Sequence, residues 1–227
     1  MMRRDYILNQ IEEFAAVLAK ILGFTKEAEW QSASVASAQE FQRLIGMDAD
    51  EALRLSETEL FARLIEGEPT HVAESKLFML ASLFKATGDV MAGRGRIEES
   101  RQHYLKGLEL LLDALDRTAI GERPDFVPTV EAFFISLSDS PLPTKTRVML
   151  MRHYEQAGEF AKAEDALFAI AEADPPGAEL FEFGESFYRR LLNKSDAILI
   201  AGNLPRTEAQ AGLANFLIKL RSKKQET

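Results

Sequence analysis

The sequence contains no cysteine, only one tryptophan and only three histidines among its 227 residues. Without cysteine this chain cannot form disulfides, thiolate zinc sites, cysteine-ligated iron–sulfur clusters or a thiolate nucleophile. It also lacks a run of about 20 apolar residues, the length that a membrane-spanning helix requires. After Met-Met-Arg-Arg, polar residues such as Asp5 and Asn9 interrupt what would be the apolar region of a signal peptide. We therefore expect a cytoplasmic protein with no membrane partner.

Basic residues are also fewer than acidic residues. Lysine and arginine total 27, against 36 for aspartate and glutamate, and the formal net charge is -9. A field of that sign repels phosphate backbones. The basic cluster Lys145, Arg147 and Arg152, with Lys223 and Lys224 in the tail, has no interleaved aromatic residues. A nucleic-acid partner is therefore disfavoured.

Helical periodicity runs through the chain, and no segment alternates apolar and polar residues for long enough to indicate a sheet. We predict an all-α protein. Ser56 and Glu59 have the spacing of a capping box, which marks a helix start. The predicted organisation is an N-terminal helical hairpin with short helices over 1–67, a helical array over 68–222 and a frayed tail over 223–227, all in one continuous domain.

The predicted first helix, residues 5–22, carries an apolar seam. Spacings of four, three, four and three residues are typical of a coiled coil, but this seam lasts only about two heptads. That short length favours packing within the chain, and pairing with a second copy as a homodimer is the alternative. The candidate dimerisation residues are Ile7, Ile11, Phe14, Leu18 and Ile21.

The segment 150–175, LMRHYEQAGEFAKAEDALFAIAEADP, resembles a tetratricopeptide (TPR) motif. The motif needs large and small residues at fixed places so that two helices can cross closely, and Arg147 departs from it where the family has a large aromatic residue. Two poorer copies lie around 84–107 and 180–187. The matching residues of the central copy are Tyr154, Gly158, Phe160, Ala163, Leu167 and Pro175.

This resemblance implies a right-handed array of antiparallel helix pairs, an α-α superhelix. A generic array of helical hairpins is the alternative. The N-terminal stretch MRRDYILNQIEEFAAVLAKILGF, and the tract Leu-Leu-Asn-Lys-Ser-Asp before Gly202-Asn203-Leu204-Pro205-Arg206, also resemble an uncharacterised bacterial family with a TPR-like helical fold. That family implies a fold and no assigned activity.

The sequence offers no set of residues that points to catalysis. Glu68 and His71 form only half of the paired Glu-x-x-His arrangement of di-iron bundles. No phosphate-binding loop and no nucleophile elbow are present. We therefore expect no enzyme activity, no cofactor and no metal. The alternative is a small-ligand binder or an enzyme that uses a pocket between helices, near Phe133 and Phe134.

A binding surface is the preferred interpretation. In a TPR array the first helices of successive pairs line a groove, and a mixed polar face there suits a peptide or a helix of a partner protein. A merely solvated face is the alternative. We predict a non-catalytic protein–protein interaction module with two sets of partner-binding residues, Lys145, Met149, Arg152 and Gln156 on one helix and Glu182, Glu185, Tyr188 and Arg189 on the next.

Overall fold

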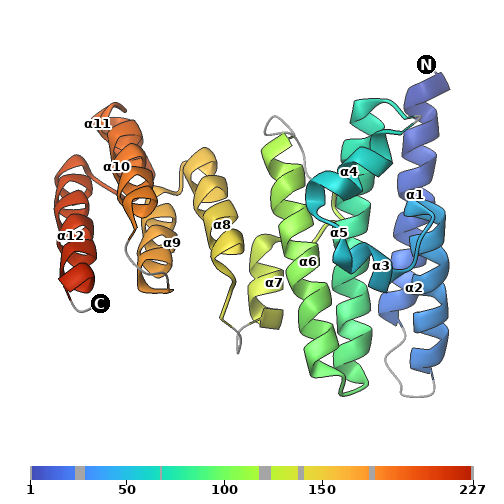
Figure 1. The fold of residues 1–227 in the computed structure, drawn as a ribbon. Coiled ribbons are helices and arrows are strands. Elements are labelled where there is room, and N and C mark those ends of the chain that lie inside the picture. Colours follow the sequence, from blue (N-terminus) through green and yellow to red (C-terminus); the bar gives the residue numbers. More distant parts are fainter. Residues whose placement is uncertain are drawn as a thin grey trace. The chain divides into compact units, whose positions relative to one another are not determined.

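A computed structural model describes residues 2–23, 29–66, 68–117, 124–137, 141–173 and 177–225. These residues form α-helices and no strand, which confirms the all-α prediction (Figure 1). None of the helices in these ranges is both long and apolar enough to cross a bilayer. The helices are α1 (Met2–Gly23), α2 (Trp30–Ile45), α3 (Ala49–Arg54), α4 (Glu57–Ile65), α5 (Thr70–Gly93), α6 (Ile97–Arg117), α7 (Val130–Leu137), α8 (Thr144–Ala157), α9 (Phe160–Ala173), α10 (Ala178–Leu192), α11 (Asp196–Ala201) and α12 (Arg206–Gln225).

The chain divides into two compact units, unit 1 over Met1–Ser140 and unit 2 over Pro141–Thr227. The sequence analysis expected one continuous domain, with N-terminal helices over 1–67 followed by an array over 68–222. In the structure α1, α2 and α4 all pack on α5, so the N-terminal helices and the α5–α6 hairpin share one core. The division falls where that core ends.

Glycine allows the closest helix contacts in unit 1. A Cβ atom placed on Gly88 of α5 would lie 2.5 Å from the Tyr104 ring of α6. A Cβ on Gly107 would lie 2.7 Å from the Phe133 ring of α7. The Tyr104 hydroxyl donates a hydrogen bond of 2.7 Å to Asp89. The glycines of the poorer repeat copy around 84–107 therefore mark real close approaches between helices.

The apolar seam of α1 packs inside unit 1. Ile7, Phe14, Leu18 and Ile21 are buried, and Ile11 is half-buried. The helix packs on α2 and α5. This packing corresponds to the first of the two interpretations given above, in which the seam packs within the chain. The side chains named above as candidate dimerisation residues are therefore used within the chain, and a second copy could reach the four buried ones only by displacing that packing.

The predicted capping box is confirmed at the start of α4. The Glu59 backbone N–H donates to Ser56 Oγ at 3.2 Å, and the Ser56 backbone N–H donates to Glu59 Oε2 at 2.7 Å. The bonds from Ser56 hold the pKa of the Glu59 carboxyl below its ordinary value. The box ends the loop before α4 and starts the helix, which places Glu57 opposite α6.

Unit 2 consists of two helix pairs. Gly158 makes the turn between α8 and α9 with φ of +78°, a left-handed conformation that glycine adopts without strain. The second pair is α10 with α12 (Figure 1). A Cβ on Gly184 of α10 would overlap the Phe216 ring of α12. The second pair thus forms across the short helix α11, which lies between its two helices in the chain.

Two predictions fall partly outside the described residues. Pro175, the closing residue of the TPR-like segment, lies outside them, as do residues 226 and 227 of the predicted tail. The backbone of α12 continues to Gln225, beyond residue 222, where the sequence analysis expected the ordered part to end.

Candidate functional site

Unit 2 contains a cavity of about 520 Å³ between α8 and α10. Three of its lining residues come from the second half of α8, two from α10 and one from the loop after α10. This is the pair of helices that the sequence analysis expected to line a groove. The lining residues are Arg152, Glu155, Gln156, Phe183, Arg190 and Lys194.

Helical spacing explains why these side chains share a face. On α8, Arg152, Glu155 and Gln156 lie three and four residues apart, while Leu150 and Met151 are buried. On α10, Phe183 and Arg190 are seven residues apart, which is two helical turns. The buried residues Leu180, Phe187 and Leu191 lie on the adjoining face of α10.

A bidentate ion pair links the two helices that line the cavity. Arg190 donates from Nε to Glu155 Oε1 and from Nη2 to Glu155 Oε2, both at 2.7 Å. The bonds to Glu155 raise the pKa of the Arg190 guanidinium above its ordinary value. Side-by-side pairs of this kind are shorter and more directional than single charged contacts. The pair joins α8 to α10 at the wall of the cavity.

The other two cations at the cavity are less engaged. Lys194 Nζ lies 5.4 Å from the centroid of the Phe160 ring. Arg152 is exposed and has no ion-pair partner within the described part of the chain. Three cations and one carboxylate leave two net positive charges at the cavity, in a chain whose formal net charge is -9. The cavity therefore attracts anionic groups, in contrast to the protein as a whole.

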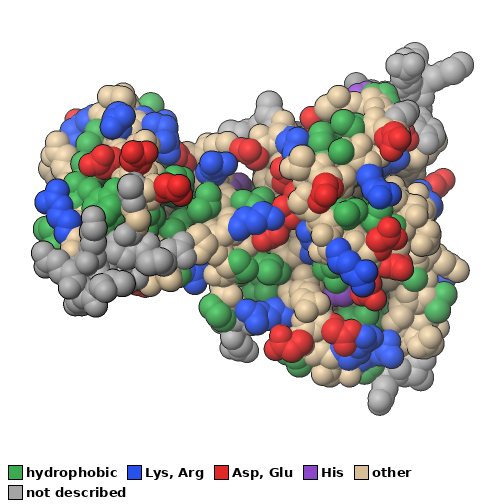
Figure 2. Space-filling view, viewed as in Figure 1, with side chains coloured by type: hydrophobic (Ala, Val, Ile, Leu, Met, Phe, Trp, Pro, Cys, Tyr) green, Lys and Arg blue, Asp and Glu red, His purple; other side chains and the backbone are tan. Residues whose placement is uncertain are grey.

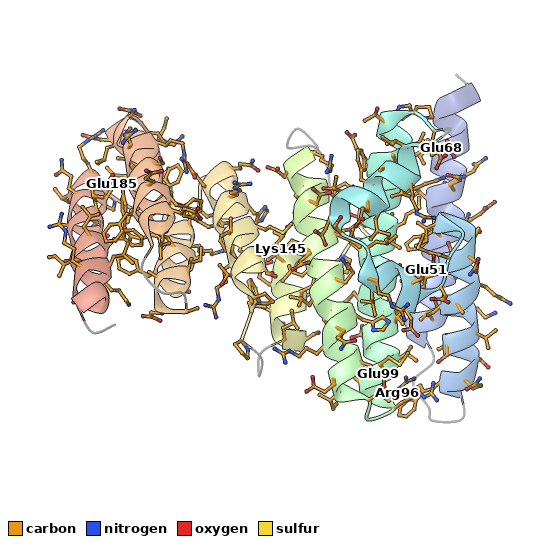
Figure 3. The ribbon with its side chains drawn as sticks, in the orientation of Figure 1. Glu51, Glu68, Arg96, Glu99, Lys145 and Glu185 are labelled. Atoms are coloured by element: carbon orange, nitrogen blue, oxygen red, sulfur yellow. The ribbon has the colours of Figure 1, made fainter. Side chains whose placement is uncertain are left out.

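On α8 the cavity includes two of the four predicted partner-binding residues, Arg152 and Gln156. Met149 is half-buried and does not line it. Lys145, labelled in Figure 3, is exposed near the start of α8 and does not line the cavity. The site therefore occupies only the C-terminal half of the predicted α8 face.

On α10 the predicted face is rotated relative to the cavity. Glu182, Glu185 and Arg189 are exposed but do not line the cavity. The lining residues Phe183 and Arg190 each follow a predicted residue by one position, which turns the face by about 100°. The sequence held one signal for the lining face, because Arg190 and Glu155 are oppositely charged residues on the two helices expected to line the groove.

Tyr188 is a core residue, which corrects its assignment as a partner-binding residue. Its side chain is fully buried, and its hydroxyl donates a hydrogen bond of 2.6 Å to Glu164 Oε1 on α9. Gly212 of α12 lies against both groups, since a Cβ there would overlap Glu164 and lie 2.8 Å from the Tyr188 hydroxyl. Burial raises the pKa of the Glu164 carboxyl. The tyrosine joins three helices and presents nothing to a partner.

Unit 1 contains a smaller cavity of about 230 Å³, lined in part by Leu53 and Lys106. Lys106 is already engaged. Its Nζ donates to the Leu55 carbonyl at 2.6 Å and to Glu57 Oε1 at 3.0 Å, and both charged side chains are nearly buried. This lysine joins α6 to α4 and its preceding loop, so its role is structural.

The three histidines lie on three different helices. His71, His103 and His153 lie on α5, α6 and α8 respectively. Within the described residues no group of three or more His, Asp or Glu side chains could hold a metal ion.

Phe133 is buried and Phe134 half-buried, and neither lines the cavities of either unit described above. The face drawn in Figure 2 shows acidic and basic side chains interspersed over both units.

The comparisons with known proteins return one family. The model of the "Family of unknown function (DUF6483)" matches residues 1–221. No curated protein and no solved structure matches the chain. Because the match extends over nearly all of the 227 residues, the chain belongs to this DUF6483 family of unknown function.

Proposed function

We propose that unit 2 is a non-catalytic protein-interaction module that binds an acidic segment of a partner protein in the cavity between α8 and α10. The observation that carries this proposal is the charge of the cavity, which is net positive by two in an acidic protein. An arginine guanidinium matches the planar carboxylate of aspartate or glutamate. Phe183 adds an apolar surface for a neighbouring side chain of the same segment.

The helix pairing of unit 2 supports the same proposal, and we infer from it a TPR-like arrangement. The pairs α8–α9 and α10–α12 are consecutive helix hairpins, and α8 and α10 are their first helices. Small residues stand where the helices cross closely, with Gly184 against Phe216 as the clearest case. In TPR-like arrays the first helices of successive pairs line the binding groove. The cavity lies on those two helices here.

The test is selection of peptides from a display library of random sequences on the full chain. The selected peptides are expected to be rich in Asp and Glu, with an apolar residue near the acidic ones. The double variant Arg152→Glu, Lys194→Glu reverses two charges of the cavity and leaves the Glu155–Arg190 pair in place. It is expected to lose those peptides.

The matched control is Lys20→Glu, Arg54→Glu, which makes the same change of charge on exposed residues of unit 1. This control should select the same peptides as the unaltered chain. Selection of peptides without acidic residues would contradict the proposal. So would an identical set of peptides from the cavity variant.

A small anionic ligand is the second candidate, because the cavity volume lies within the range of about 300–1,000 Å³ usual for small-molecule sites. Succinate serves as the probe, since it carries two carboxylates and no peptide. Tight binding of succinate to the full chain, lost in the Arg152→Glu, Lys194→Glu variant, would favour this candidate. Weak or absent binding of succinate by a chain that selects acidic peptides would favour the protein partner.

A further inference from the structure

The geometry points to Glu155 as the residue that determines how many negative charges a bound segment must bring. This inference rests on the proposed binding of an acidic segment in the α8–α10 cavity. Glu155 is itself a lining residue, and its carboxylate already occupies the guanidinium of Arg190 through two hydrogen bonds of 2.7 Å. One internal carboxylate thus holds one of the two arginines.

The burial of the pair makes Glu155 hard to displace. The Glu155 side chain is 15% exposed, whereas the Arg190 side chain is 49% exposed. An incoming carboxylate that took Arg190 would leave Glu155 poorly solvated and without its partner, which is costly for a charged group. We expect a bound segment to leave the pair intact and to use the cations that remain.

Those remaining cations are Arg152 and Lys194, which come from α8 and from the loop after α10. A segment with two adjacent carboxylates can neutralise both of them. A segment with one carboxylate leaves one cation unmatched, and it gains nothing from Arg190. Glu155 therefore makes the site selective for doubly charged segments, and without it a singly charged segment could use the guanidinium of Arg190.

The test uses three acetylated and amidated peptides with the sequences Gly-Ser-Leu-Asp-Asp-Ser-Gly, Gly-Ser-Leu-Asn-Asp-Ser-Gly and Gly-Ser-Leu-Asn-Asn-Ser-Gly. They carry two, one and no carboxylates, and their blocked termini add no charge. Binding to the full chain is measured by NMR titration. The unaltered chain is expected to bind the first peptide about tenfold tighter than the second.

The Glu155→Gln variant is expected to bind the singly charged peptide about three- to tenfold tighter than the unaltered chain does. The ratio of affinities between the doubly and the singly charged peptide should therefore be smaller in this variant. The double variant Glu155→Gln, Arg190→Gln should lose that gain, because Glu155 acts through Arg190. Glu185→Gln is the matched control. It removes one carboxylate from an exposed position on α10, marked in Figure 3, and leaves the ion pair intact. It should change both affinities less than twofold.

If Glu155→Gln and Glu185→Gln changed the peptide affinities equally, the inference would be overturned, because Glu155 would then contribute only to the overall electrostatic field. Peptide binding, and with it the proposed function, would still stand in that case. If none of the three peptides binds and the library yields no acidic peptide, the proposed function fails first. If Glu155→Gln does not fold, Glu155→Asp keeps the charge but shortens the side chain, and it should also relax the discrimination.

Discussion

Tyr188 on α10 donates its hydroxyl hydrogen to Glu164 on α9 over 2.6 Å, while Gly212 of α12 lies against both. Three helices therefore meet at one hydrogen bond inside unit 2. The bond secures α10, the helix that carries Phe183 and Arg190 to the cavity. Tyr188 and the two lining residues thus lie on different faces of one helix.

Replacement of Tyr188 by Phe should lower the free energy of unfolding by about 1–2 kcal/mol, because it leaves a half-buried carboxyl without its donor. Chemical denaturation followed by circular dichroism measures the change. Glu164→Gln keeps a hydrogen-bond acceptor and should cost less than Tyr188→Phe. A cost for Tyr188→Phe within experimental error would mean that the bond does not secure α10.

Glu164 should also give unit 2 a pH dependence. Burial raises the pKa of this carboxyl in the folded chain above its ordinary value of 4.5, so the folded state holds the proton more tightly than the unfolded state. The resulting stability is fully present below pH 4.5 and is lost as the pH rises through the folded pKa. The unfolding free energy of the unaltered chain minus that of Glu164→Gln should therefore fall with rising pH. A flat difference would contradict this.

His103 should produce a pH dependence of opposite sign in unit 1. Burial lowers the pKa of this imidazole below 6.5, and Nδ1 lies 2.7 Å from the Glu99 carbonyl oxygen while Nε2 is buried without a hydrogen-bond partner in the described structure. The unfolded chain therefore takes up the proton first, and stability falls as the pH drops below 6.5.

The measurement for His103 compares unfolding free energies of the unaltered chain and His103→Gln between about pH 5 and pH 8. The difference should shrink towards low pH, by at most about 1.4 kcal/mol per pH unit. His71→Gln, at an exposed position of α5, is the control and should leave the slope of the unaltered chain unchanged. If the unfolding free energy of His103→Gln changed with pH as steeply as that of the unaltered chain, the prediction would be wrong.

Gly184→Ala should destabilise unit 2 by about 1–3 kcal/mol, because the new methyl group would overlap the rigid ring of Phe216. Gly177→Ala is the matched control, since a Cβ at that glycine meets nothing within 4 Å and its φ of -109° suits alanine. Thermal unfolding measures both. Equal stability of the two variants would show that α10 and α12 do not cross as closely as described.

Much of the local structure could be predicted from the residues alone. The capping box at Ser56 and Glu59 and the turn at Gly158 depend on contacts between residues a few positions apart. Such features follow from short-range geometry, which the order of residues specifies directly.

The candidate site could be predicted only in part. The sequence indicated the two helices that line the cavity and two of its lining residues, Arg152 and Gln156. The face that it predicted on α10 differs from the lining residues by about one position, and it took the buried Tyr188 for a surface group. A shift of one residue turns a helix face by about 100°, and α10 carries apolar residues on more than one side, so its pattern alone did not settle the rotation.

Helix content and helix boundaries therefore follow from short-range interactions along the chain, because caps, glycine turns and periodicity act within a few residues. Which helix packs on which depends on contacts between residues far apart in the sequence. Packing on α5 buried the seam of α1, and the fit of Phe216 against Gly184 paired α10 with α12 across α11. Shape complementarity of this kind arises only when the helices meet, so a linear pattern does not reveal it.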